Sequence, residues 1–313
     1  MALIPLRIVP ADTKLDFIGK RNIAFVFSAV LMVLSVGFFA VKGLNYGIDF
    51  KGGILMEVRT PGPANLPQLR RKLSGLGLGE VALQEFGEPT DVLIRVERQP
   101  GGEKAQQRAV DTVKQALGSD IASYRRVESV GPKVGDELIR AGIIAVILSI
   151  LVIMVYVWFR FEWQFSIGAV VALTHDVIST IGIFSVIGLE FNLATVAAIL
   201  TIAGYSINDT VVVFDRIREN LRKYKTMGVQ ELLNLSINQT LSRTILTSVT
   251  TLLALFAIFF FGGEVIADFA FALIWGVLIG TYSSIWIASP ILLFLNIRDH
   301  ISPGVVAKTD AGG

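Results

Sequence analysis

Six long apolar stretches dominate the pattern of hydrophobic and polar positions along the chain. Each can cross a bilayer, because about 20 helical residues, rising 1.5 Å apiece, span the ~30 Å hydrocarbon core. The predicted spans are residues 22–42, 137–159, 165–187, 193–214, 244–261 and 269–295. The chain is 53% hydrophobic and has a mean hydropathy of +0.63, well above an ordinary soluble domain. The pattern therefore predicts a mainly α-helical integral membrane protein with six transmembrane helices.

Residues 43–136, between the first and second spans, are too polar to enter a bilayer. Alternating apolar positions predict strands there, and apolar residues three and four apart predict helices. The expected elements are a strand at 54–59, a helix at 66–76, strands at 81–86 and 92–96, a helix at 103–117 and a strand at 123–130. The order βαββαβ predicts a small ferredoxin-like α+β domain. It contains no histidine and no pair of nucleophile and base, so we expect it to have a binding role or to act as a lever, and not to catalyse a reaction.

The distribution of Lys and Arg predicts how the chain is oriented. The short loops at 188–192 and 262–268 contain neither residue, whereas the opposite side of the membrane is rich in both. The positive-inside rule therefore places residues 1–21 and 296–313 in the cytoplasm and residues 43–136 outside it. The remaining long connection, 215–243, is also cytoplasmic. It is basic in its first half and carries an apolar stripe in its second, which predicts an amphipathic helix lying along the membrane surface.

Ionisable and polar side chains within the spans are few and occur together. His175 and Asp176 lie in the third span, Asn208 and Asp209 in the fourth, and Arg243 at the start of the fifth. Counting 1.5 Å per residue from the outer ends places Asp209 about 24 Å deep and Arg243 about 27 Å deep, at nearly the same level. Asp176 lies about 16 Å from Ile187, closer to the outer face.

An aspartate at membrane depth costs about 2.5–3.5 kcal/mol even on insertion scales, and titratable groups in adjacent spans are typical of proton relays. We therefore predict that these five residues couple to protons. Simpler interpretations remain for some of them. Arg243, taken alone, is typical of an arginine at the end of a span whose side chain extends to the membrane surface. His175 is then a histidine buried for packing, and Asp176 is a hydrogen-bond partner of His175.

Small residues at spacings of three and four predict close helix contacts. The fourth span carries such a stripe, with Asp209 at its edge, which favours a packed helix interface over a lipid-facing position. The stripe consists of Ala194, Ala197, Thr201, Gly204 and Asn208. The last span carries a second set, consisting of Gly276, Gly280, Ser284 and Ala288.

The composition narrows the possible chemistry. There is no cysteine, which excludes disulfides and thiolate metal sites, and the net charge is only +2. We expect no cofactor, no metal, no enzymatic activity and no nucleic-acid partner.

Several motifs identify the chain as similar to the SecD/SecF family of protein-export membrane proteins, relatives of the proton-driven RND transporters. GIDFKGG at 47–53 resembles the signature that opens the family's exported domain, and VGPKVG at 130–135 resembles its re-entry motif. LTHD at 173–176 and GYSIND at 204–209 are similar to the SecF versions of the third and fourth spans, and SRTILTS at 242–248 to the fifth.

The resemblance implies a bacterial inner-membrane protein that uses the proton-motive force to assist late steps of Sec-dependent export of unfolded polypeptides. It implies that Asp209 and Arg243 match positions needed for this coupling. It also implies SecD as a partner, supplied as a separate chain, together with the SecYEG translocon and the accessory subunits YajC and YidC.

Three other functions remain as alternatives. A small-molecule RND exporter is disfavoured by the small single insert. A passive scaffold of the translocase would need no titrating aspartate. An intramembrane aspartyl protease would use Asp176 and Asp209 as a dyad, but the second aspartate follows Ser206-Ile207-Asn208 and not the G-x-G step of such enzymes.

Overall fold

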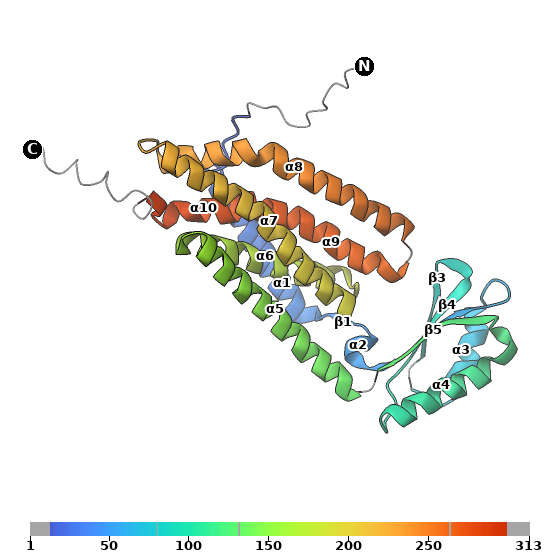
Figure 1. Ribbon diagram of the computed structural model, residues 1–313. Coiled ribbons are helices and arrows are strands. Elements are labelled where there is room, and N and C mark those ends of the chain that lie inside the picture. The colour runs from blue at the N-terminus through green and yellow to red at the C-terminus, as the bar shows by residue number, and fades with distance from the viewer. Residues whose placement is uncertain (1–12, 80, 131, 263, 299–313) are drawn as a thin grey trace, which may run out of the picture.

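The computed structural model describes residues 13–79, 81–130, 132–262 and 264–298. Within them, six helices are long and apolar enough to cross a membrane, and a small sheet domain lies at one end of the bundle that they form (Figure 1). The long helices are α1 (Arg21–Lys42), α5 (Pro132–Arg160), α6 (Trp163–Ile187), α7 (Leu193–Lys223), α8 (Val229–Phe261) and α9 (Glu264–Ser283). The predicted fold class is confirmed.

The last helix continues beyond α9 with a change of pitch. A π-helical turn covers Ser284–Ala288, followed by α10 (Ser289–Ile291) and the 3-10 turn Leu292–Phe294. Such single π turns inside helices are common at functional sites.

The connection between α7 and α8 differs from the predicted helix along the membrane surface. α7 continues to Lys223, and α8 runs unbroken from Val229 into the fifth span. The apolar stripe does not need a membrane surface, because it packs inside the chain. Leu232, Leu233 and Ile237 are buried in one cluster with residues of α7 and with Phe17 and Ile18 of the N-terminal segment.

The sheet domain has the predicted ferredoxin-like topology. Its strands are β2 (Gly53–Arg59), β3 (Val81–Phe86), β4 (Glu88–Val96) and β5 (Ser123–Val130), and its helices are α3 (Leu66–Ser74) and α4 (Glu103–Leu117). The strand order is β3-β4-β2-β5, with every neighbouring pair antiparallel. Alternate residues Ile54, Met56 and Val58 of β2 face the helices and form the centre of the core.

One strand of this domain is longer than predicted. β4 begins at Glu88, four residues before the expected start, because Gly87 alone turns the chain between Phe86 and its partner Glu88. Gly87 has φ +74°, a left-handed conformation that glycine adopts without a steric penalty.

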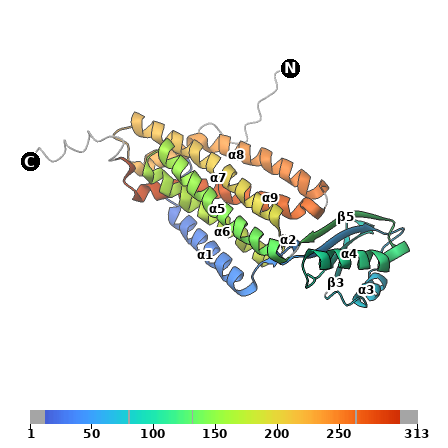
Figure 2. The same ribbon diagram turned by 60° about the horizontal axis from the view of Figure 1, so that its bottom comes forward.

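The first span and the sheet domain are tied to the beginning of α7. The two-residue strand β1 (Asn45–Tyr46) pairs in parallel with β6 (Glu190–Phe191), and the short helix α2 (Ile48–Lys51) follows β1. The Asp49 carboxylate accepts a 2.9 Å hydrogen bond from the backbone N–H of Leu193, the first residue of α7. Figure 2 shows α2 between the bundle and the sheet domain. The residues at 47–53 therefore connect the first span, the sheet domain and the start of α7.

A second connection is an ion pair. Arg95 of β4 donates to Glu190 of β6, so the sheet face that lies away from α3 and α4 contacts the end of the bundle that carries β6. Burial raises the pKa of the Glu190 carboxyl above its usual value, and the nearby Arg95 opposes that rise.

Candidate functional site

A fully buried carboxylate lies between α6, α7 and α9. Asp176, on α6, is 0% exposed. Its Oδ2 accepts hydrogen bonds from Ser206 of α7 at 2.6 Å and from Ser283 of α9 at 2.8 Å, and its Oδ1 lies 3.1 Å from Nδ1 of His175. Both oxygens thus have partners, as buried polar groups normally do. The arrangement joins three spans through one side chain.

His175 extends this network toward the first span. It is 4% exposed, and its Nε2 has no hydrogen-bond partner. Its ring lies 6.1 Å from that of Tyr282, whose hydroxyl donates to the carbonyl of Ala24 at 2.8 Å and lies 3.0 Å from the Ser28 hydroxyl. The pair His175–Asp176 is therefore bounded by α1, α7 and α9.

Asp209 lies in a different environment on α7. It follows Ser206 by three residues and is only 3% exposed, yet its Oδ2 has no hydrogen-bond partner. Arg243 of α8 is the charged neighbour that acts on it electrostatically. The two residues are predicted to lie at nearly the same depth, but no ion pair within 4.0 Å joins their side chains in the described structure. Asp209 is thus buried without the donors that Asp176 has.

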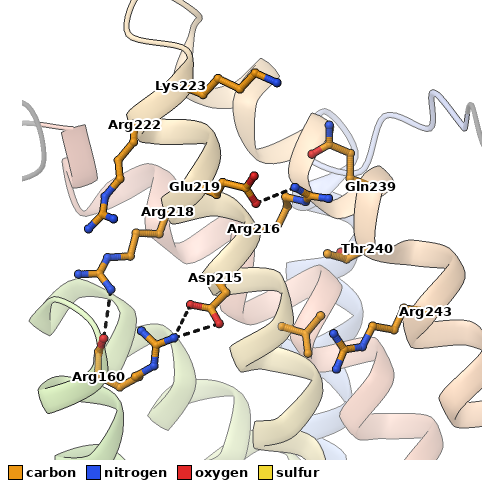
Figure 3. A pocket seen from close by; sticks show the side chains of 11 residues that line it. Arg160, Asp215, Arg216, Arg218, Glu219, Arg222, Lys223, Gln239, Thr240 and Arg243 are labelled. Carbon is orange, nitrogen blue, oxygen red and sulfur yellow. Dashed lines mark hydrogen bonds and ion pairs between the residues drawn. The ribbon is translucent and has the colours of Figure 1, made fainter.

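Arg243 lies instead along a hollow at the end of the bundle where α7 meets α8 (Figure 3). Its side chain is exposed and its guanidinium points toward α7. Arg160 and Asp215 form an ion pair at 2.9 Å on the other side of the same hollow. Arg243 is therefore positioned between a buried carboxylate and a polar opening.

Asn208 and Gly204 do not face the buried aspartates Asp176 and Asp209. The whole stripe predicted on α7 faces outward and is exposed, and a Cβ placed on Gly204 would meet no atom within 4 Å. The prediction that Gly204 packs against a helix is therefore wrong for helices of this chain, because α9 packs on the opposite face of α7. That face carries Ile202 and Ser206.

The predicted small residues of the last span do lie at a close helix contact. A Cβ on Gly276 would overlap Ile202, and one on Gly280 would lie 3.0 Å from the Cβ of Ser206. Ser284 Oγ lies 2.8 Å from Thr210 Oγ1. Close approach of α7 and α9 at these positions brings Ser206 and Ser283 onto Asp176.

Sequence reasoning missed the hydroxyl residues around Asp176. Ser206 and Ser283 resemble ordinary small packing residues, and nothing in their local sequence marks them as partners. A signal was nevertheless present, since Ser206 lies about 20 Å from the outer end of its helix and Asp176 about 16 Å from the end of its own. The same comparison of depths that was applied to Asp209 would have brought these two residues together.

Two other kinds of site find no support in the described residues. No group of three or more His, Asp or Glu side chains is arranged to hold a metal ion there. No hydrogen bond connects the Asp176 carboxylate, whose partners are His175, Ser206 and Ser283, to Asp209, as an aspartyl dyad requires.

Comparisons with known proteins agree with this architecture. The family model described as "Protein export membrane protein SecD/SecF, C-terminal" matches residues 109–298, and the "SecD/SecF GG Motif" matches residues 37–60. The chain is 47% identical over 300 residues to "Protein translocase subunit SecF" of Rickettsia rickettsii (strain Sheila Smith), covering 95% of this chain and 97% of that protein. The protein of the same name from Rickettsia bellii (strain OSU 85-389) is also 47% identical, with 95% and 98% covered.

Two solved structures share the fold. The crystal structure of SecDF, a translocon-associated membrane protein from Thermus thermophilus, matches with a TM-score of 0.80 and 37% identity over 92% of this chain. SecDF in its Super-membrane-facing form matches with a TM-score of 0.69 and 36% identity over 94% of this chain. This chain spans 39% and 40% of those chains, respectively.

Proposed function

Because the chain belongs to the SecD/SecF family of protein-export membrane proteins and is a SecF-type subunit of the protein translocase, we propose that it uses the proton-motive force to assist late steps of Sec-dependent export. It is a multi-pass inner-membrane protein. In this proposal it acts as a transport subunit and not as an enzyme. Asp209 changes its protonation state, Arg243 responds to that change, and residues 43–136 act on the exported polypeptide.

The observation that carries the proposal is the state of Asp209. Its carboxyl is 3% exposed, has one oxygen without a hydrogen bond, and lies near Arg243 without forming a close ion pair. A buried carboxyl beside an arginine is subject to two opposed effects, desolvation and charge attraction. Protonation removes its charge and so releases Arg243, whereas loss of the proton restores the attraction.

The available driving force is large enough for such a step. Moving one charge through 100 mV provides about 2.3 kcal/mol, and each pH unit adds about 1.36 kcal/mol. A desolvated Asp–Arg attraction is worth a few kcal/mol. One proton can therefore shift the balance between two arrangements of α7 and α8.

The contacts at the start of α7 support a route from this site to the exported domain. Asp49 holds the first N–H of α7, and β6, just before α7, pairs with β1. α7 is continuous from there to Asp209 and beyond. A shift of α7 would thus move the point at which the sheet domain is attached. The domain could then hold an emerging polypeptide and prevent it from sliding back.

The exposed stripe on α7 supports contact with a partner helix. Small and polar residues that face lipid gain nothing from that exposure, whereas they let another helix approach closely. We assign this stripe, which includes Gly204 and Asn208, to the contact with SecD. SecD would supply the other half of the proton route, and SecYEG, YajC and YidC would complete the assembly with the membrane lipid around it.

The orientation of the chain is part of the proposal. Both termini lie in the cytoplasm, and residues 43–136 lie in the periplasm. Protease added to the outer face of spheroplasts should cut within or beside residues 43–136 and spare residues 215–243. Cleavage confined to 215–243 would overturn this orientation.

The function is tested by replacing Asp209 with a residue that has its shape and polarity but cannot titrate. Asp209→Asn should assemble in normal amount with its partners and lose the gradient-dependent part of export, by about tenfold or more, while the ATP-driven part remains. Asp209→Glu should keep part of the activity, because it still titrates. Glu231→Gln, which likewise replaces a carboxylate with its amide but at an exposed position on α8, is the matched control.

Export is measured in membrane vesicles with the proton gradient intact or collapsed. If Asp209→Asn exports at the wild-type rate and still responds to collapse of the gradient, the chain is a scaffold and Asp209 is a packing residue. A small-molecule exporter would instead show gradient-driven efflux of a solute with export of polypeptides unchanged in Asp209→Asn.

A further inference from the structure

A basic hollow lies at the end of the bundle opposite the sheet domain. It measures about 830 Å³ and is bordered by the end of α5, the last three turns of α7 and the first half of α8 (Figure 3). Six cationic side chains and two carboxylates line it, which leaves an excess of four positive charges. The cations are Arg160, Arg216, Arg218, Arg222, Lys223 and Arg243.

Three of these cations lack a carboxylate partner. Asp215 is paired with Arg160 at 2.9 Å and Glu219 with Arg216 at 2.6 Å, so both lining carboxylates are already engaged. Among the described residues, no ion pair within 4.0 Å is formed by Arg222, Lys223 or Arg243. The hollow thus offers unmatched positive charge, with Arg222 on the side of α5 and Arg243 on the side of α8 (Figure 3).

The depth of the hollow matches the headgroup layer of a membrane. Val212, which also lines it, lies about 28 Å along α7 from Leu193, near the limit of a ~30 Å hydrocarbon core. Arg216 and Arg218 lie about 34 and 37 Å along the same helix, within the headgroup layer that borders this core. Arg222 lies further along, and its side chain points back toward Arg218 (Figure 3). Arg216 and Arg218 therefore occupy the layer in which phospholipid phosphates lie, and the side chain of Arg222 extends toward that layer.

Apolar surface next to the hollow suits acyl chains. Trp158 and Phe159, beside Arg160 at the end of α5, are 59% and 88% exposed, and Leu246, one turn beyond Arg243 on α8, is 52% exposed. A free phosphate or a soluble nucleotide would have no use for these surfaces. Basic pockets between transmembrane helices on the cytoplasmic side are typical binding sites for anionic lipid headgroups.

We propose that this hollow binds the headgroup of an anionic phospholipid, with Arg222 as the phosphate-binding residue, Lys223 adding positive charge at the rim, and the acyl chains lying along α5 and α8. Guanidinium groups suit this ligand because they donate two parallel hydrogen bonds to phosphate oxygens. The proposal does not depend on proton coupling, since a lipid site at this position would exist in a scaffold as well.

The test uses the full chain, purified in mild detergent and offered phosphatidylglycerol, tetra-acyl cardiolipin or phosphatidylcholine, with retained lipid counted by native mass spectrometry. The wild-type chain should retain the two anionic lipids and release phosphatidylcholine. Each surface cation contributes about fivefold in affinity for anionic lipid, so Arg222→Gln/Lys223→Gln should bind roughly 10- to 30-fold more weakly. Lys104→Gln/Arg108→Gln, the same loss of two exposed charges from α4, is the matched control and should retain lipid as the wild type does.

Three results would overturn the proposal. Equal retention by Arg222→Gln/Lys223→Gln and the wild type would exclude the hollow as the site, as would equal retention of phosphatidylcholine. Displacement of the lipid by millimolar inorganic phosphate would show that the hollow takes free anions. Acyl-brominated phosphatidylglycerol gives a second readout, because it should quench the tryptophan fluorescence of the chain, to which the exposed Trp158 contributes, more strongly in the wild type than in the double variant.

Discussion

Two aspartates of the same bundle, Asp176 and Asp209, are buried to nearly the same extent and have opposite hydrogen-bonding environments. Asp176 has partners for both oxygens, drawn from His175, Ser206 and Ser283. Asp209, one turn beyond Ser206 on α7, has an oxygen with no partner at all. Two aspartates that are nearly equally buried therefore differ in whether the fold supplies hydrogen-bond donors for them.

We propose that the two residues have different roles. A buried carboxylate with matching donors holds α6, α7 and α9 together, and its removal leaves those donors unpaired. A buried carboxylate without donors contributes little to folding, because its desolvation is not compensated. We propose that Asp209 acts through its charge, and Arg243 is the charged neighbour that this charge acts on.

The largest expected effect comes from truncating the two aspartates and comparing their stability. Asp176→Ala should destabilise the chain by about 3 kcal/mol or more, because Ser206 and Ser283 lose their acceptor in a dry interior. Asp209→Ala should be neutral or slightly stabilising, because it removes an uncompensated polar group. Thermal unfolding in detergent and the amount of folded chain in membranes measure both. Equal destabilisation by the two changes would end the distinction between them.

The next prediction concerns the charge that Asp209 acts upon. Arg243→Met should assemble normally, since this side chain is exposed, and should lose most of the gradient-dependent export, by about tenfold. If the two residues work as one unit, Asp209→Asn/Arg243→Met should be no worse than either single variant, because residues that share a function are not additive. Arg243→Lys should keep part of the activity. Additive losses in the double variant would mean that the two residues act separately.

Removal of the sheet domain compares the bundle with the domain attached to it. Replacing residues 54–129 with a short Gly/Ser linker preserves Asp49, β1 and β6, so the bundle should still fold and bind its partner. Its internal contacts, such as Gly276 and Gly280 against α7, lie outside the deleted region. Export should fail nevertheless, and co-purification with SecD measures assembly. Normal export by the shortened chain would show that the domain is not a lever.

Much of the fold could be predicted because its signals are local. Runs of apolar residues set the six spans, and alternation set the strands of a domain whose topology the structure confirms. The packing of the connection between α7 and α8 could not be predicted in the same way. Leu232, Leu233 and Ile237 have the same amphipathic pattern whether they face a membrane or another helix, and only the tertiary contacts with Phe17 and Ile18 decide between the two.

The site was only partly predictable, for a related reason. A charged residue at membrane depth is conspicuous in any sequence, which identified Asp176, Asp209 and Arg243. The serines that surround Asp176 are not conspicuous, because a serine costs little in a helix interface and occurs there for packing as well. The orientation of the α7 stripe also depends on which face α9 occupies. Periodicity shows that a helix has a small face, but not which neighbour covers it.

The smallest expected effect concerns the ion pair between the two regions. Burial makes the folded chain bind a proton at Glu190 more readily than the unfolded chain does, since it raises the pKa of that carboxyl while Arg95 opposes the rise. Stability contributed at this position therefore falls as pH rises from the ordinary glutamate pKa through the raised one. In Arg95→Gln the opposing positive charge is gone, so the pKa of Glu190 rises further. The folded chain therefore loses more stability at high pH. The variant should be less stable than the wild type by about 1 kcal/mol at pH 8 and nearly equal to it at pH 5.

Arg126→Gln, which removes the partner of Glu128 on the same sheet, is the control and should show no such dependence on pH. Thermal unfolding of the full chain at both pH values measures the difference. A deficit of the same size at pH 5 and pH 8 would mean that Arg95 stabilises the contact by packing and not through the charge of Glu190.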